Sequence, residues 1–167
     1  QNFVGTGDYG PAYPDQNIRT EYTYDLNGNL IATKDTAGVI TRTYYDALNR
    51  PVTIVQHLTG QAISVVTPPN RGASFNIRTD TFYDGNGNVI ATIDPKGVAT
   101  RTYYDALNRP ITVVQNLVGQ TIGAATPPPA GVEANIRSDT YYDEAGRVIA
   151  TVDPVGLVTR TYYDSAN

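Results

Sequence analysis

The chain repeats itself every 59 residues, and this self-similarity restricts its possible folds more than any other feature. The tripeptide Asn-Ile-Arg begins at Asn17, Asn76 and Asn135. When residues 76–108 are laid over residues 135–167, 22 of the 33 positions are identical. A fixed period of this kind indicates a repeat protein, in which each copy buries its surface against its neighbours. We therefore expect one continuous array, with these parts: the tail of a preceding repeat and a linker at 1–16, repeat unit 1 at 17–75, repeat unit 2 at 76–134, and an incomplete repeat unit 3 at 135–167.

The residues of one copy predict a series of short strands joined by tight turns. Residues 77–84 alternate between two faces with a period of two, which is typical of a β-strand. The following Asn86-Gly87 predicts a two-residue type I′ hairpin turn, because both central residues of that turn need positive φ. Turn residues at regular intervals then predict further strands at 89–94, 98–105 and 110–117, and a short fifth strand near 121–125.

The fold class that follows is all-β. We predict tandem antiparallel β-hairpin or meander repeats, with a 59-residue superunit of about five short strands, stacked into an elongated rod or a solenoid-like sheet. Asn108 is expected to take the left-handed conformation that Gly holds in other turns. Pro127–Pro129 are expected to end the ladder, because proline has no N–H to donate. No stretch shows the 3.6-residue period of an amphipathic helix.

Composition removes several classes of function. There is no Cys, which excludes disulfides, thiolate metal sites and a cysteine nucleophile, and His57 is the one histidine. A net charge of −4 argues against a nucleic-acid surface, which needs clustered Lys and Arg. No segment approaches the roughly 18 apolar residues of a membrane span. We therefore expect no cofactor, no metal, no nucleic acid and no membrane span, and the absence of Met indicates a piece of a longer protein.

A Tyr-Asp pair occurs twice in each copy, the second 21 residues on from the first. An Asp at the end of a strand can accept N–H groups of the following turn, while the Tyr ring packs on a neighbouring strand. The alternative is a ladder of exposed tyrosines that binds sugars or a partner. Repetition favours the structural role, because catalysis needs one special place. The predicted structural repeat positions are Tyr24, Asp25, Tyr45, Asp46, Tyr83, Asp84, Tyr104, Asp105, Tyr142, Asp143, Tyr163, Asp164, Gly28, Gly87, Gly146, Arg42, Arg101 and Arg160.

Each copy has one arginine four residues before the aspartate of its second Tyr-Asp pair. The arginine and that aspartate lie on the same face of the strand. We expect these arginines, Arg42, Arg101 and Arg160, to pair with carboxylates on adjacent strands. An exposed pair contributes about 0–1 kcal/mol. A row that binds anions is the alternative, and the net charge of −4 disfavours it.

The 21-residue pattern resembles the YD repeat of RHS-repeat proteins. Tyr83-Asp84-Gly85-Asn86-Gly87-Asn88-Val89 and Tyr142-Asp143-Glu144-Ala145-Gly146-Arg147-Val148 carry the match, followed by Asp-Pro-x-Gly and Thr-Arg-Thr-Tyr-Tyr-Asp. The family includes bacterial RHS proteins, the shell component of insecticidal toxin complexes and the teneurins. The resemblance implies an extracellular or secreted protein with long β-sheets, often wound into a hollow shell around a toxin. This chain departs from the pattern by a Pro-containing spacing of 38 residues, which favours a regular rod or filament.

Two motifs have a chemical interpretation beside a structural one. Residues 25–29 and 84–88 resemble the start of a calcium loop, but the bidentate acid that such a loop needs further on is missing. Asp153-Pro154-Val155-Gly156-Leu157 spells the string found where RHS cores cut themselves. It aligns with residues 94–98, so we interpret it, like the two loops, as a hairpin turn.

We therefore expect a structural, non-catalytic segment of a fibre, stalk or filament of an extracellular or cell-surface bacterial protein. The chain starts and stops inside the same strand of the repeat, which leaves edges that can template strand addition. Self-association, or continuation of the same array end to end, is the expected partnership. The alternatives are the wall of an RHS-type toxin-encapsulating β-shell and a carbohydrate- or cell-binding adhesin module. An enzyme is not expected, because no nucleophile, base and orienting group converge.

Overall fold

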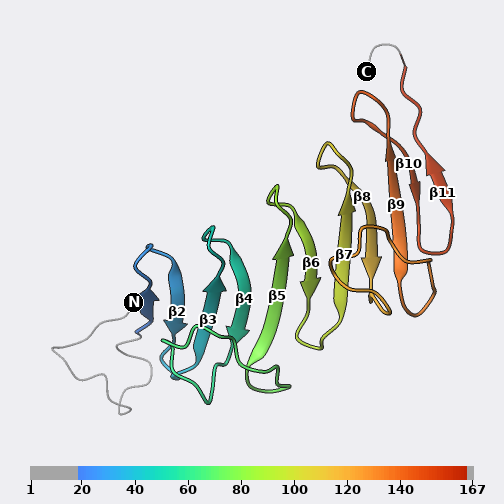
Figure 1. Ribbon diagram of the computed structural model, residues 1–167. Helices are drawn as coiled ribbons and strands as arrows, with labels where there is room; N and C mark the ends of the chain where they lie inside the picture. Colours follow the sequence, from blue (N-terminus) through green and yellow to red (C-terminus); the bar gives the residue numbers. More distant parts are fainter. Residues whose placement is uncertain (1–18, 165–167) are drawn as a thin grey trace. The chain divides into compact units, whose positions relative to one another are not determined.

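In the computed structural model, the described residues, 19–164, belong to two compact units that divide after Thr79. All regular elements of residues 19–164 are β-strands (Figure 1). The first unit contains β1 (Glu21–Tyr24), β2 (Leu30–Lys34), β3 (Ile40–Tyr45), β4 (Pro51–Gln56) and the first residues of β5 (Ile77–Tyr83). The second contains the rest of β5, then β6 (Val89–Ile93), β7 (Ala99–Tyr104), β8 (Pro110–Gln115), β9 (Ile136–Tyr142), β10 (Val148–Val152) and β11 (Val158–Arg160).

Within each unit, strands that follow one another in the chain are antiparallel neighbours (Figure 1). The register repeats with the sequence. Tyr44 of β3 lies opposite Thr53 of β4, and Tyr103 of β7 lies opposite Thr112 of β8. The predicted all-β meander of tandem repeats is therefore confirmed.

The tight turns share one geometry, which differs from the predicted type I′ turn. In the turn after β5, the Gly87 N–H donates to the Asp84 carbonyl at 3.2 Å, and the Asp84 N–H donates to the Asn88 carbonyl at 3.0 Å. Gly87 has φ 90°, whereas Asn86 is not among the residues with positive φ. The loop is thus a three-residue turn with a bulge, and the register shifts accordingly at Tyr83. The type I′ prediction was wrong because the Asp84 carboxylate accepts the Asn86 N–H and holds the extra residue in the loop.

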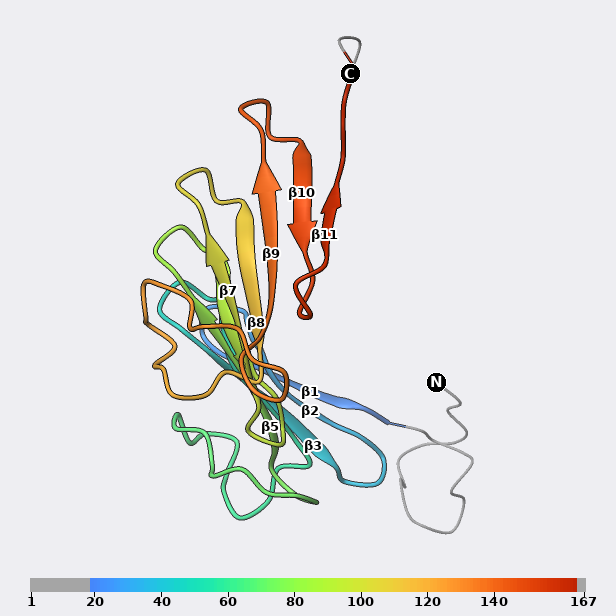
Figure 2. The same ribbon diagram turned by 90° about the vertical axis from the view of Figure 1, so that its right-hand side faces the viewer.

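The predicted fifth strand near residues 121–125 is also wrong. Residues 116–135 form a series of turns and bends that stands to one side of β7 and β8 (Figure 2). We call this segment, and its counterpart at residues 57–76, the spacer loop. β8 pairs directly with β9, Val114 lying opposite Arg137, so the ladder has no place for a further strand between them. Asn135 closes the loop, because its N–H donates to the Asn116 carbonyl at 2.9 Å and its Oδ1 accepts the Val118 N–H at 2.8 Å.

The core lies between the sheet and the spacer loop. In the first unit, Tyr44 and Val55 from the sheet are buried together with Leu58 from the loop, and Ile63 packs against them. The corresponding Tyr103 and Val114 are buried in the second unit. The sheet therefore depends on its own spacer loops to cover the apolar residues of this face.

No helix within residues 19–164 could cross a membrane.

Candidate functional site

The aspartate of the Tyr-Asp pair closes the turn that follows it. Oδ1 of Asp105 accepts the N–H groups of Leu107 at 2.9 Å and Arg109 at 3.0 Å, and Oδ2 accepts the Arg109 Nε–H at 2.7 Å. Asp46 and Asp143 hold Arg50 and Arg147 in the same way. Three of the turns take their positive φ from glycine, at Gly28, Gly87 and Gly146.

These hydrogen bonds lower the pKa of the capping carboxyl groups. The backbone N–H four residues on is the main cause of the lowered pKa at Asp46, Asp105 and Asp143. At Asp25 and Asp84 the main cause of the lowered pKa is the side-chain amide of Asn29 or Asn88. A carboxylate with a lowered pKa and several donors is a turn cap, and it is a poor general base.

The tyrosine of the pair fastens its strand to the preceding one. The Tyr104 hydroxyl donates to the carbonyl of Val89, the first residue of β6, at 3.0 Å. The same bond, also 3.0 Å long, occurs three more times: Tyr45 to Leu30, Tyr142 to Pro110 and Tyr163 to Val148. Tyr24 is 59% exposed in β1, and Tyr83 is the last residue of β5. Each hydroxyl that makes this bond is thus used within the sheet.

The predicted pairing of Arg42 and Arg101 with carboxylates is wrong. Arg42 is only 6% exposed, and Arg101 is only 7% exposed. Arg42 donates to the carbonyls of Ile31 and Thr43, and Arg101 makes the equivalent bonds to Ile90 and Thr102. The guanidinium groups lie on the covered face of the sheet, where main-chain carbonyls are the acceptors within reach. Arg160, the third of the series, is exposed.

Each buried arginine lies against a buried tyrosine. The Arg42 guanidinium lies 4.5 Å from the centre of the Tyr44 ring, and Arg101 lies 4.4 Å from that of Tyr103. Burial raises the pKa of Tyr44, while the nearby Arg42 charge and a hydrogen bond from Gln61 oppose the rise. Burial likewise lowers the pKa of Arg42. The Arg–Tyr pair is therefore a buried structural contact beneath the spacer loop.

A second arginine series forms ion pairs at the turns, and the sequence reasoning missed it. Arg50, Arg109 and Arg147 each lie 2.7 Å from the Oδ2 of the aspartate four residues earlier. Arg109 also lies 4.6 Å from the centre of the Tyr142 ring, and Arg147 lies 4.5 Å from that of Tyr163. The signal was the spacing Asp-x-x-Asn/Gly-Arg, which places the arginine directly after the residue of positive φ.

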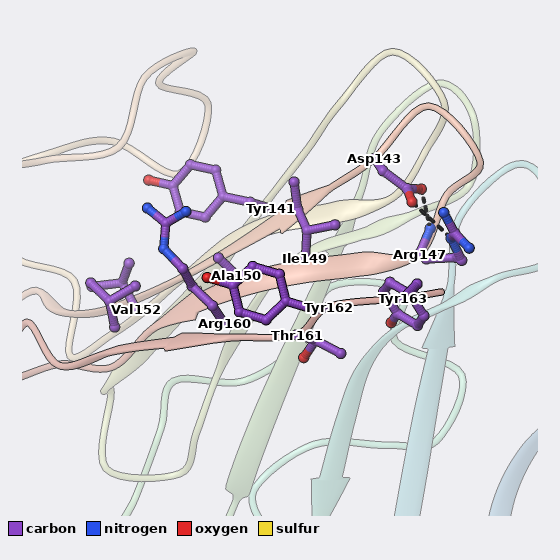
Figure 3. Close-up of a pocket in the computed structure, with 11 residues that line it drawn as sticks. Tyr141, Asp143, Arg147, Ile149, Ala150, Val152, Arg160, Thr161, Tyr162 and Tyr163 are labelled. Atoms are coloured by element: carbon purple, nitrogen blue, oxygen red, sulfur yellow. Dashed lines mark hydrogen bonds and ion pairs between the residues drawn. The ribbon is translucent and has the colours of Figure 1, made fainter. Parts of the chain in front are cut away.

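A hollow of about 610 Å³ lies beside β10 and β11 in the incomplete third copy (Figure 3). Tyr141, Ile149, Arg160 and Tyr162 line it. The dashed lines in Figure 3 join Asp143 to Arg147, which is the turn cap described above. The hollow therefore presents aromatic and aliphatic surface with Arg160 and the Asp143–Arg147 turn cap in its lining.

The remaining candidate motifs are structural elements. The DPxGL string is a turn in which Asp153 Oδ1 accepts the N–H groups of Val155 and Leu157. The calcium-like loops are hairpin turns of the same kind. Residues 19–164 contain no cluster of three His, Cys, Asp or Glu side chains that could hold a metal ion. His57 packs edge-on against Phe75, with 4.6 Å between the ring centres.

The RHS repeat family matches residues 24–62 and 83–120 of this chain. A comparison with curated proteins found no match. Among solved structures, the chain is similar to the Photorhabdus luminescens Tc holotoxin pore. The two share 21% identity with a TM-score of 0.54, over 80% of this chain and 5% of the other.

Two crystal structures of TcdB2-TccC3 are similar as well. The form without the hypervariable C-terminal region is 19% identical with a TM-score of 0.54, over 81% of this chain and 5% of the other. The second form is 15% identical with a TM-score of 0.53, over 87% of this chain and 7% of the other. The chain thus spans only 5–7% of the length of these proteins, and the likeness is one of fold.

Proposed function

Because the chain is an RHS/YD-repeat protein, we propose that it serves as a non-catalytic structural segment of a secreted or cell-surface repeat array. One observation carries this proposal. Recurring side chains join a copy to itself and to its neighbouring strands: aspartates cap turns, tyrosine hydroxyls bind the preceding strand, and arginines lie over tyrosine rings. A residue type that is used in this way at each repeat has a mechanical role, since catalysis would need one copy to differ.

The array takes one of two forms, a fibre or stalk, or the wall of a shell. The regular spacer loop in each complete copy supports the fibre, because it gives each 59-residue unit the same neighbours. The likeness to Tc toxin proteins over 80–87% of this chain supports the shell wall. Electron microscopy of the full-length parent protein distinguishes them: a linear particle supports the fibre and a closed hollow particle supports the shell.

The structural role itself is tested by Tyr104→Phe, which removes the hydroxyl and leaves the ring. We expect the free energy of unfolding to fall by about 0.5–1.5 kcal/mol, because the bond to the Val89 carbonyl is lost. The measurement is chemical denaturation followed by circular dichroism. Tyr22→Phe, at a 56% exposed residue of β1, serves as the matched control. Unchanged stability of Tyr104→Phe, together with loss of ligand binding or activity in the parent protein, would contradict the structural role.

A further inference from the structure

The sheet of the second unit has two faces of different composition. Residues directly opposite each other in antiparallel strands lie on the same face, and so do residues two positions apart in one strand. The strand registers therefore place nine uncharged residues on one face, which we call the threonine face: Thr81, Thr92, Thr100, Thr102, Val113, Ser138, Thr140, Thr151 and Thr159.

The threonine face is open to solvent. None of its nine residues is buried, and Thr92 of the complete second copy is exposed, as is Thr151 of the third. The spacer loop, residues 116–135, stands on the other side of the sheet (Figure 2), where Arg101 is 7% exposed and Tyr103 is 5% exposed. Because a copy with its own strand-and-loop cover leaves the threonine face open, this exposure belongs to the repeat itself.

The distribution of charge is the reverse of that in an ordinary solvated sheet. The covered face contains the charged residues: Arg101 donates to the Ile90 carbonyl at 2.7 Å, and the Arg137 Nε–H donates to the Asp139 Oδ1 at 2.8 Å. A soluble surface typically contains about 25–35% charged residues, so about two or three of the nine exposed positions would be expected to have a charge. The threonine face has none, which indicates a surface that another uncharged surface covers.

The first unit, taken by itself, has a face of the same kind. Thr33 lies opposite both Tyr22 and Thr41, and Thr43 lies opposite Ile54. Tyr22 is 56% exposed and Ile54 is 41% exposed. The absence of charge from this face therefore recurs with the repeat.

The composition of the threonine face matches that of its own copy in a second molecule. A charged side chain pressed against this face would lose its hydration without gaining a partner of opposite charge. Each threonine offers a methyl group that can pack and a hydroxyl that can both donate and accept, so two such faces can satisfy each other. Other surfaces of the chain contain charges, such as Glu133 on the spacer loop and Lys96 in a turn, both exposed.

The threonine face is also large enough for a specific contact. Because neighbouring strands lie about 4.8 Å apart and each residue rises about 3.4 Å, β5–β11 present a face of roughly 30 Å by 20 Å. Two such faces together would bury about 1,200 Å², which is the lower end of the range for stable protein–protein interfaces. We therefore expect an association that depends on concentration.

We propose that the threonine face is an interface between two copies of this chain. The two sheets pack face to face about 10 Å apart, in a two-fold arrangement in which each contact occurs twice. The spacer loops then lie on the two outer sides of the pair. This contact differs from end-to-end association, which uses strand edges, and it is independent of the non-catalytic role proposed above.

The test is analytical ultracentrifugation of the 167-residue chain over a range of concentrations, which is expected to show a reversible equilibrium between monomer and dimer. Thr92→Lys combined with Thr151→Lys should weaken the dimer at least about tenfold, because the interface would then enclose like charges without partners. Thr126→Lys makes the same change at an exposed threonine of the spacer loop and is the matched control, so it should associate as the unmodified chain does. Circular dichroism verifies that each variant keeps the β-sheet spectrum.

A charge-reversed variant makes the test independent of how one variant folds. Mixing the double lysine variant with Thr92→Asp combined with Thr151→Asp should restore association, because opposite charges then face each other. A chain that is monomeric at every concentration overturns the proposal, and so does an association that the two lysines leave unchanged, as contact through strand edges would give. Either result would leave the stability expected for Tyr104→Phe unaffected, so it would not count against the structural role.

Discussion

At the scale of single residues, the turn cap shows how one position can be filled by different side chains. The aspartate always accepts the N–H four residues on. Its second oxygen accepts an amide from Asn88 in one turn and a guanidinium from Arg109 in another. Both side chains present an N–H at the same place, so the turn tolerates the exchange. The aspartate itself cannot be exchanged as freely, because its carboxylate serves two or three donors at once.

The capping carboxylates predict acid sensitivity. The folded-state pKa values of Asp46, Asp105 and Asp143 lie below the ordinary value of 3.8, so the unfolded chain takes up protons first as the pH falls. Their contribution to stability is fully present above that value and is lost as the pH falls through the folded pKa values. Circular dichroism should show a thermal midpoint that is constant from pH 7 to about 5 and falls below about 4.

Asp105→Asn should show a shallower fall in acid than the parent, from a lower midpoint at neutral pH, because the variant has one capping carboxylate fewer to protonate. Glu144→Gln, at an exposed turn position, is the control. An acid slope for Asp105→Asn identical to that of the parent would argue against the cap as its origin.

Asn108 combines a backbone role with a side-chain role, and two substitutions separate them. It has φ 59°, and its Oδ1 accepts the amides of Asn86 and Asn88 at 2.8 Å each. Asn108→Gly keeps the backbone conformation and should lower the free energy of unfolding by about 1 kcal/mol. Asn108→Ala should lower it by about 2 kcal/mol, because a Cβ in the left-handed region adds strain. Denaturant unfolding measures both, and a stability of Asn108→Ala equal to that of Asn108→Gly would refute the backbone contribution.

At the scale of elements, the unit of the fold is a four-strand meander with a spacer loop over one face. The strands without this loop would leave Arg42 and Tyr44 more exposed, as their repeat counterparts Arg160 and Tyr162 are. The loop is held at its base by Asn76, whose N–H donates to His57 and whose Oδ1 accepts the Thr59 N–H. The Asn-Ile-Arg signature thus begins with the residue that closes the spacer loop.

Two leucines test the covering role of the loop. Leu58 belongs to the spacer loop and is 6% exposed, whereas Leu48 is 69% exposed at a turn. Leu58→Ala should reduce the free energy of unfolding by about 2–4 kcal/mol through lost burial and the cavity that remains. Leu48→Ala should change it by less than about 0.5 kcal/mol. Chemical denaturation compares the two, and similar losses at both positions would contradict the loop as part of the core.

At the scale of the whole molecule, stability in a repeat array depends on the neighbours that each copy has. The first and second copies contain a complete strand-and-loop cover, which buries Tyr44 and Tyr103. The third copy, with its exposed Tyr162, is therefore expected to be the least protected part of the second unit against hydrogen exchange.

Completing the third copy should stabilise it. We expect a chain with residues 109–131 repeated after Asn167 to melt at a higher temperature, because Tyr162 and Arg160 would then be covered as their counterparts are. The same extension carrying Val→Asp at the position of Val114 is the matched control. Calorimetry measures the thermal midpoints of both extended chains. Equal midpoints would show that the repeat cover does not form.

The sequence determined the features that involve a few neighbouring residues. The 59-residue period, the antiparallel meander and the left-handed Asn108 all followed from turn chemistry and alternation, because a turn is closed by bonds among five consecutive residues. The type I′ turn failed for a local reason: the Asp84 side chain adds hydrogen bonds that the Asn-Gly rule does not include.

Only the tertiary structure decided what the spacer loop does and where the arginines lie. Whether residues 116–135 form a strand or a cover depends on β8 meeting β9 directly, which joins residues more than twenty positions apart. Whether an arginine is exposed or buried depends on that cover, as Arg101 and Arg160 show with the same local sequence. Local conformation is set by bonds within a turn, whereas burial is set by distant segments that compete to cover the same surface.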